Sequence, residues 1–290
     1  MVPIDHSRPE ARSAAQSLRQ LSASERRRMW SAVVDRVAAG VIGSGASSLV
    51  AHDEPHRFLL IPSSKADYAP SGPLPVPSPN PKAADMAVHF HEEDLPEGVL
   101  ADGPVAVDTE TMGLVTTRDR LCLVQISDGN GDEHLVRFAP DSEYDAPNLQ
   151  AVLADPDRLK LFHFARFDLA AIEYYLGVTA APCYCTKIAS KLVRTYTDRH
   201  GLKNLVEELL GENISKAQQS SDWGGPELNQ AQRDYAASDV RFLHRMREEL
   251  NRRLEREGRM ELAQSCFDFL PTRAHLDILG WADHDIFSHA

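Results

Sequence analysis

The clearest pattern of apolar and polar positions lies in the middle of the chain, where short apolar runs are separated by polar turns. Strands are predicted at 104–109, 120–127 and 134–138, and Gly129-Asn-Gly fits a hairpin turn between the second and the third. A further apolar run at 161–164 predicts a buried strand. These segments predict a β-sheet in the central part of the chain.

Helical spacing dominates between and after these strands. Helices are predicted at 148–154, 167–177 and 187–194, and the longest helical pattern runs over 227–253. Residues 261–286 are interpreted as a C-terminal tail whose apolar side chains pack back on the domain or on a partner. The order of strand, strand, strand, helix, strand and then several helices predicts an α/β fold, with a mixed sheet flanked by helices.

The first strand carries two carboxylates with strand spacing. Asp108 and Glu110 are two residues apart, so they share one face of the strand. Two like charges on an inward face repel each other, and hard divalent ions such as Mg²⁺ and Mn²⁺ take oxygen ligands. Gly113 then permits a tight turn where a substrate approaches the backbone. The alternative is a solvent-facing strand edge with two exposed acids.

Two later segments add acidic residues in a similar setting. Asp168 is predicted in the first turn of the helix that follows the strand at 161–164, where a carboxylate also suits the helix dipole. Tyr235 and Asp239 are four residues apart and lie on one face of the long helix. Such a phenol can serve a metal-held water as a base or an orienting group. The alternatives are an ordinary helix-start Asp and a core tyrosine beside a surface aspartate.

In this order, the three motifs resemble the DEDD superfamily of 3′–5′ exonucleases in its tyrosine subclass, and the sequence between them resembles ribonuclease D most closely. Three further segments carry the likeness: Cys185-Thr-Lys-Ile-Ala-Ser-Lys191-Leu-Val, His200-Gly-Leu-Lys203-Asn-Leu and Gln219-Ser-Ser-Asp222-Trp223. The resemblance covers about residues 86–290. It implies a ribonuclease-H-like fold with a helical C-terminal portion.

The resemblance also implies the site. Four carboxylates would hold two divalent metal ions, Mg²⁺ or Mn²⁺: Asp108, Glu110, Asp168 and Asp239. Tyr235 would position the attacking water, and Leu114 would pack against the terminal bases. The full set of expected substrate-binding residues is Thr109, Gly113, Leu114, His163, Lys187 and Lys191.

The chain departs from the family pattern in two respects. His163-Phe-Ala-Arg stands where the family usually has His-Asn-Ala-Lys, so Phe164 and Arg166 differ from it. Long ribonuclease D proteins continue into helical HRDC domains, whereas this chain ends about fifty residues after Asp239. It resembles the short form, a catalytic domain with little else.

A formal net charge of −12 argues against a simple nucleic-acid binder but permits an enzyme that reaches phosphates through metals. One basic cluster stands out: Lys187, Lys191, Arg194, Arg199 and Lys203. Three of these, at 187, 191 and 194, are expected on one side of a helix, where they would guide a single strand to the acidic site. A solvated basic helix face is the alternative. Modest affinity, strong salt dependence and little base preference are expected.

Four cysteines form no CxxC pair and no zinc-like spacing, which predicts reduced, buried thiols in a cytoplasmic protein. No apolar run approaches the length of a membrane span, so no membrane partner is expected.

The N-terminal part has a different composition. Residues 1–63 are interpreted as an extension with a helix at 12–41, and 64–85 as a proline-rich linker. Residues 86–290 form the predicted exonuclease domain. Whether the native chain starts at Met86 is left open, as is a weak homo-oligomer.

We therefore predict a metal-dependent 3′–5′ exoribonuclease that releases nucleoside 5′-monophosphates from single-stranded RNA 3′ ends by a two-metal mechanism. The candidate substrates include tRNA precursors and structured RNA with 3′ overhangs. Two alternatives are kept: the same chemistry on DNA, and a catalytically silent domain that binds nucleic acid or protein.

Overall fold

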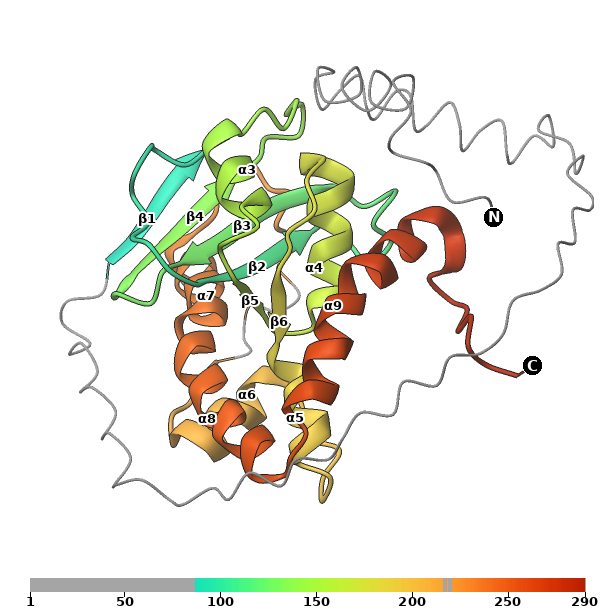
Figure 1. Ribbon diagram of the computed structural model, residues 1–290. Coiled ribbons are helices and arrows are strands. Elements are labelled where there is room, and N and C mark those ends of the chain that lie inside the picture. The colour runs from blue at the N-terminus through green and yellow to red at the C-terminus, as the bar shows by residue number, and fades with distance from the viewer. Residues whose placement is uncertain (1–86, 216–217, 219–220, 290) are drawn as a thin grey trace, which may run out of the picture. The chain divides into compact units, whose positions relative to one another are not determined.

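The computed structural model describes residues 87–215, 218 and 221–289, so the predicted extension at 1–63 and linker at 64–85 lie outside the described residues. Within the described part, six strands form one mixed sheet in the order β1-β4-β3-β2-β5-β6 (Figure 1). The strands are β1 (Ala87–Glu92), β2 (Val105–Thr111), β3 (Leu121–Ser127), β4 (Asp132–Arg137), β5 (Lys160–Phe162) and β6 (Cys183–Cys185).

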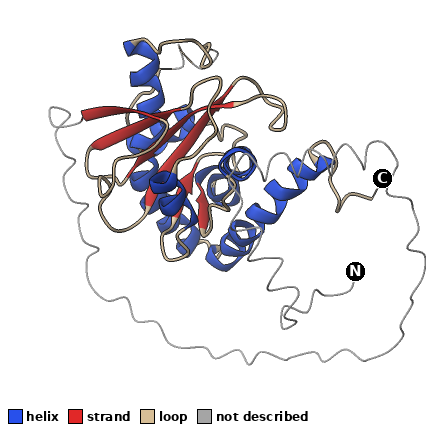
Figure 2. Ribbon diagram, turned by 90° about the horizontal axis from the view of Figure 1, so that it is seen from above, coloured by secondary structure: helices blue, strands red, loops and turns tan. Residues whose placement is uncertain are grey.

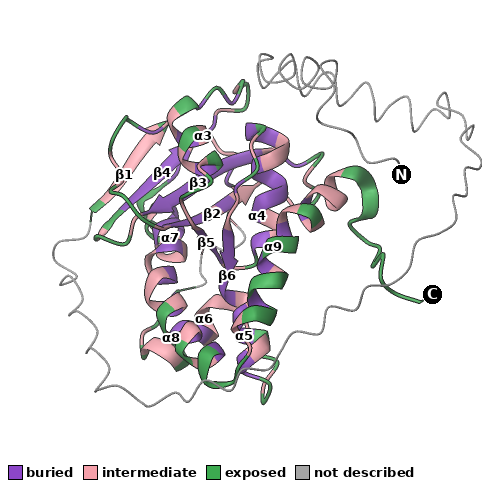
Figure 3. Ribbon diagram, viewed as in Figure 1, coloured by how far each residue is buried: buried purple, intermediate pink, exposed green. Residues whose placement is uncertain are grey.

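Both kinds of strand pairing occur in this sheet. β3 pairs antiparallel with both β2 and β4. The other pairings are parallel: β1 with β4, β2 with β5, and β5 with β6. Gly129 and Gly131 adopt positive φ in the turn between β3 and β4, as the predicted hairpin requires. Every residue of β3 is buried, which makes this strand the centre of the core (Figure 3).

The helices cover both faces of the sheet (Figure 2). They are α3 (Pro147–Ala154), α4 (Ala165–Ala171) with its π-helical continuation η2 (Ile172–Leu176), α5 (Thr186–Val193), α6 (Leu202–Leu205) with η3 (Val206–Leu210), α7 (Gln230–Arg241), α8 (Leu243–Arg256), and α9 (Met260–Leu276) with η4 (Asp277–Trp281). On one face, Leu123 and Leu135 pack with Ala236 and Ala237 of α7. The alternate residues of the same strands face the opposite way and join the larger core.

The elements predicted in the central part agree with the structure to within two residues at their ends, and the predicted mixed α/β fold is confirmed. β1 was not predicted. It carries polar residues at alternate positions, and its His89 and His91 rings stack with His134 of β4 at centroid distances of 4.9 and 5.3 Å. This alternation of apolar and polar residues is itself the pattern of a half-buried strand, so the sequence did contain a signal for β1.

The long helical pattern at 227–253 is two helices, because the chain turns at Phe242 between α7 and α8. The predicted C-terminal tail at 261–286 is mostly the helix α9, in agreement with the expected helical C-terminal portion. Pro271 inside α9 has no N–H to donate to the carbonyl of Phe267 four residues earlier. The thiol of Cys183 donates to that carbonyl instead, at 3.5 Å. Phe267 is buried, so this segment packs back on the domain.

All four cysteines are free, and three of them are buried as predicted, whereas Cys266 is only partly buried. No helix in the described part of the chain combines the length and the apolar character that crossing a membrane requires.

Candidate metal centre and active site

β2 places the first two carboxylates at the middle of the sheet. Asp108 lies opposite Gln125 of β3, and Glu110 lies opposite Leu123, so all four side chains share one sheet face. The regular pairing shifts between Glu110 and Thr111. Asp108 and Glu110 therefore lie on a central strand, just before the place where its pairing with β3 shifts.

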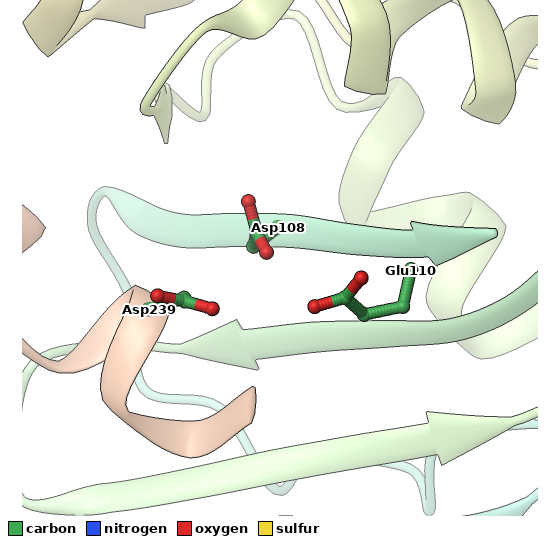
Figure 4. A group of neighbouring side chains, drawn as sticks. All are labelled: Asp108, Glu110 and Asp239. Atoms are coloured by element: carbon green, nitrogen blue, oxygen red, sulfur yellow. The ribbon is translucent and has the colours of Figure 1, made fainter. Parts of the chain in front are cut away.

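α7 brings the third carboxylate to the same place. The helix begins with a capping box in which the Asn229 side chain accepts from the backbone N–H of Gln232, and the Gln232 side chain accepts from the N–H of Asn229. Asp239 lies near the end of this helix. Oxygen atoms of Asp108, Glu110 and Asp239 lie within 4.8 Å of one another, which is the single such group found among the described residues. Their carboxylates point into the same space between β2 and α7 (Figure 4).

Asp168 lies in the first turn of α4, as predicted, and is buried. The hydroxyl of Thr109 donates to its Oδ1 at 2.7 Å. Thr109 is itself buried, and this hydrogen bond holds the Asp168 carboxylate in place. The contact predicted between Thr109 and the substrate stays a prediction.

The four carboxylates affect each other's ionisation. Burial, followed by the charges of its three neighbours, raises the pKa of Asp108 well above its ordinary value. Burial, Asp239 and Asp168 raise the pKa of Glu110 to about 9. Burial raises the pKa of Asp168 and of Asp239 to about 7 each. An ionised cluster of this kind is unfavourable without a positive charge, and its all-oxygen donor set fits a hard divalent cation. The residues present therefore fit the metal that the sequence predicted.

Tyr235 stands one helical turn before Asp239 and is half-buried. Burial raises the pKa of its phenol, and the charges of Asp239, Glu110 and Asp108 raise it further. A hydrogen bond between Tyr235 and Asp239 lowers the pKa of the carboxyl. In the metal-free protein the phenol consequently keeps its proton at neutral pH, and it can orient a neighbouring water.

His163 follows β5 and is held in one tautomer. The Thr186 hydroxyl donates to the carbonyl of Phe162 at 3.1 Å, so it accepts from Nδ1 of His163 at 2.9 Å. Burial, followed by the charge of Lys187, lowers the pKa of His163 to about 3. The imidazole is neutral at physiological pH, and Nε2 keeps its lone pair.

Gly113 and Leu114 lie in the loop after β2. A Cβ at position 113 would stand 2.4 Å from the Oδ2 atom of Asp119. The residue must therefore be small to admit this carboxylate, which accepts from the backbone N–H of Val115 at 2.9 Å. Gly113 has no positive φ, so the reason for glycine is close packing and not a special turn. Leu114 is 86% exposed, an unusual position for a leucine and one open to a ligand.

Phe164, one of the two departures from the family pattern, caps α4 in the left-handed conformation with φ of 73°. Bulky residues seldom adopt this conformation, and such strain is found preferentially at functional sites. The ring is 48% exposed, with Nζ of Lys187 4.2 Å from its centroid. The other departure, Arg166, forms an ion pair with Asp277.

The predicted basic helix face is only partly present. Lys191 is exposed and Lys187 partly exposed on α5, but Arg194 is fully buried and paired with Glu208. Arg194 also donates to the Arg199 carbonyl. The prediction that Arg194 guides a nucleic-acid strand was wrong. The sequence alone does not show that Glu208, fourteen residues later, folds back to form an ion pair with Arg194.

Gln125, which faces Asp108 across the sheet, was not among the residues predicted for the site. Gln125 is fully buried in β3, and neither its Oε1 nor its Nε2 has a hydrogen-bond partner. A single amide within an apolar strand was the signal that would have found it.

Comparisons with known proteins agree on one family. Residues 88–255 match a family model described as 3′–5′ exonuclease. A curated ribonuclease D from Gluconacetobacter diazotrophicus is 38% identical over 161 residues, covering 56% of this chain and 40% of the relative. The chain thus spans less than half the length of this curated relative.

Solved structures show the same likeness. Brucella melitensis NrnC bound to pGG is 52% identical, covers 71% of this chain and 100% of that one, and superposes with a TM-score of 0.68. Another structure of that protein contains bound Mg²⁺. Escherichia coli RNase D, described as an exoribonuclease involved in structured RNA processing, is 27% identical with a TM-score of 0.51, covering 59% of this chain and 44% of that one.

Proposed function

Because this chain belongs to the 3′–5′ exonuclease family, we propose that it is a metal-dependent exoribonuclease that removes nucleoside 5′-monophosphates from the 3′ end of single-stranded RNA. The observation that carries this proposal is the convergence of Asp108, Glu110 and Asp239 from two elements, with Asp168 beside them. All four family carboxylates are present, which disfavours a catalytically silent domain.

The four carboxylates would hold two divalent ions, Mg²⁺ or Mn²⁺. Such ions lower the pKa of a bound water and neutralise charge that develops on the phosphate. The protein contributes a rigid frame: Asp108 and Glu110 on the central strand, and Asp239 on a capped helix. The Thr109 hydroxyl fixes the rotamer of Asp168. This preorganisation limits the reorganisation that the reaction requires.

Tyr235 would orient the attacking water through its phenol. We expect Tyr235→Phe to reduce kcat by about 10²-fold, the usual scale for a lost orienting group, while divalent-ion affinity changes little. Single-turnover hydrolysis and calorimetric titration of Mn²⁺ on the same preparation separate the two effects. Full activity in Tyr235→Phe would show that the assigned role is wrong.

The substrate would approach over the exposed groups beside the carboxylates. Leu114 offers an apolar surface for a terminal base, and Lys187 and Lys191 offer positive charge to the backbone. His163, neutral with a free Nε2, would accept a hydrogen bond and not bind phosphate as a cation. With two lysines and a net charge of −12, affinity should be modest and should fall steeply with salt.

RNA is the proposed substrate because two of the three named relatives are ribonuclease D proteins. Structured RNA with a 3′ overhang, including tRNA precursors, is the proposed class, and the free cysteines suit the cytoplasm as the proposed compartment. DNA of the same sequence remains the second candidate, because no described residue is identified as reading the 2′-hydroxyl.

A time course on 5′-labelled RNA tests the proposal. We expect a ladder that shortens from the 3′ end with Mg²⁺ or Mn²⁺, and no shortening with EDTA or with Asp239→Ala. A DNA oligomer of the same sequence, run in parallel, compares the two substrate classes. Intact RNA under both metals would contradict the enzyme proposal.

A further inference from the structure

Gln125 is a buried polar side chain without a partner inside the protein. It is 0% exposed on β3, where five of the other six residues are apolar or cysteine, and both polar atoms of its amide lack hydrogen bonds. Buried amides are nearly always satisfied, because an unpaired one loses its bonds to water without compensation. The unpaired amide of Gln125 therefore indicates a hydrogen-bonding partner that is not another part of the protein.

The sheet register locates that group. Gln125 is directly opposite Asp108 on the antiparallel neighbour β2, and directly opposite Leu135 on β4. Residues facing each other across a ladder point to the same side, with Cβ atoms about 5 Å apart. That side is covered by α7, the helix that carries Asp239. The Gln125 side chain thus lies on the sheet face that carries the carboxylates, beside Asp108 on one neighbouring strand and Leu135 on the other.

The chemistry of the amide complements an ionised, metal-loaded cluster. An ionised carboxylate only accepts hydrogen bonds, and Nε2 supplies donors. Oε1 supplies an acceptor for a water of the ion's hydration shell, which Mg²⁺ characteristically retains.

We propose that Gln125 is a positioning residue of the metal centre, which orients the Asp108 carboxylate through Nε2 and holds hydration water of a bound divalent ion through Oε1. The proposal rests on the proposed function, since it requires the carboxylates to bind a divalent ion. On this proposal, the Gln125 amide forms its hydrogen bonds when a divalent ion is bound at the carboxylates.

Gln125→Met, which keeps the length of the side chain and removes the amide, tests this. The metal-free variant should be more stable in EDTA, with Tm raised by about 2–6 °C, because an unsatisfied amide is gone. Its affinity for Mg²⁺ and Mn²⁺, measured by calorimetry, should fall about 10- to 100-fold, the usual effect of losing a group that supports metal ligands. Raised Mn²⁺ should restore most of the turnover, so the defect lies in metal affinity and not in kcat.

Asn251→Leu is the matched control. Asn251 also has a buried unsatisfied amide atom, but it lies on α8. This variant should keep wild-type metal affinity whatever its Tm. Gln125→Leu repeats the test should the methionine variant fail to fold.

Two outcomes would overturn the inference in distinguishable ways. If wild type binds divalent ions and Gln125→Met binds them within twofold as tightly, the amide does not serve the metal centre, and the proposed function stands. If wild type binds no divalent ion at the carboxylates, the proposed function fails together with this inference.

Discussion

Replacing Asp108 by Asn is expected to abolish hydrolysis and at the same time to stabilise the metal-free protein. Asp108 is partly buried beside three other carboxylates, and both its burial and their charges raise its pKa. Asparagine has the same shape and no charge, so the repulsion disappears. Turnover should fall by about 10³-fold or more, because a lost metal ligand removes several kcal/mol of charge stabilisation in the transition state.

Thermal unfolding in EDTA and single-turnover hydrolysis in Mn²⁺ measure the two effects. A Tm raised by a few degrees in Asp108→Asn corresponds to about 1–2 kcal/mol for a domain of this size. Asp168→Asn is the matched comparison. Its carboxylate already accepts from the Thr109 hydroxyl, so neutralising it should gain less stability. Loss of stability in Asp108→Asn, or turnover within tenfold of wild type, would contradict the assigned role.

The carboxylate positions were predictable because each depends on a short-range periodicity. Asp108 and Glu110 share a face through the two-residue repeat of a strand, and Tyr235 and Asp239 through the helical i, i+4 spacing. The helix start at Asp168 follows from the strand before it. Such local rules place a side chain on a face, and the resemblance to a known family then indicated that the three faces meet.

Features that depend on tertiary contacts escaped prediction. The burial of Arg194 depends on Glu208, which comes from a separate helical segment. The helix α9 continues through Pro271, and the Phe267 carbonyl that this proline leaves free accepts from the Cys183 thiol of a distant strand. The apolar strand around Gln125 marks its amide as unusual, but the place of this amide beside the carboxylates is set by β2 and α7. Local pattern cannot report a partner that the fold supplies from elsewhere.

The metal-free protein is expected to lose stability as the pH rises, and divalent ions are expected to restore it. Burial raises the pKa of Glu110 to about 9 and that of Asp168 and Asp239 to about 7, above the ordinary values near 4. A group whose pKa is higher in the folded state contributes stability that is fully present below the unfolded pKa. That contribution is lost as the pH rises through the folded pKa. The decline should therefore extend from about pH 4 to about pH 9.

Ions bind the ionised cluster and compete with these protons, so metal affinity should rise over the same range. The increase in Tm on adding saturating Mg²⁺ should accordingly be larger at about pH 9 than at about pH 6, by several degrees for a site occupied at a hundred times its Kd. Unfolding scans with Mg²⁺ and with EDTA across this range measure the difference. Asp108→Asn combined with Asp239→Asn should show only a small Mg²⁺-induced shift at every pH, because two of the four proposed metal ligands are lost. A Mg²⁺-induced shift in wild type that stays constant with pH would mean that the carboxylates are already ionised in the metal-free protein, and that some other group neutralises the cluster.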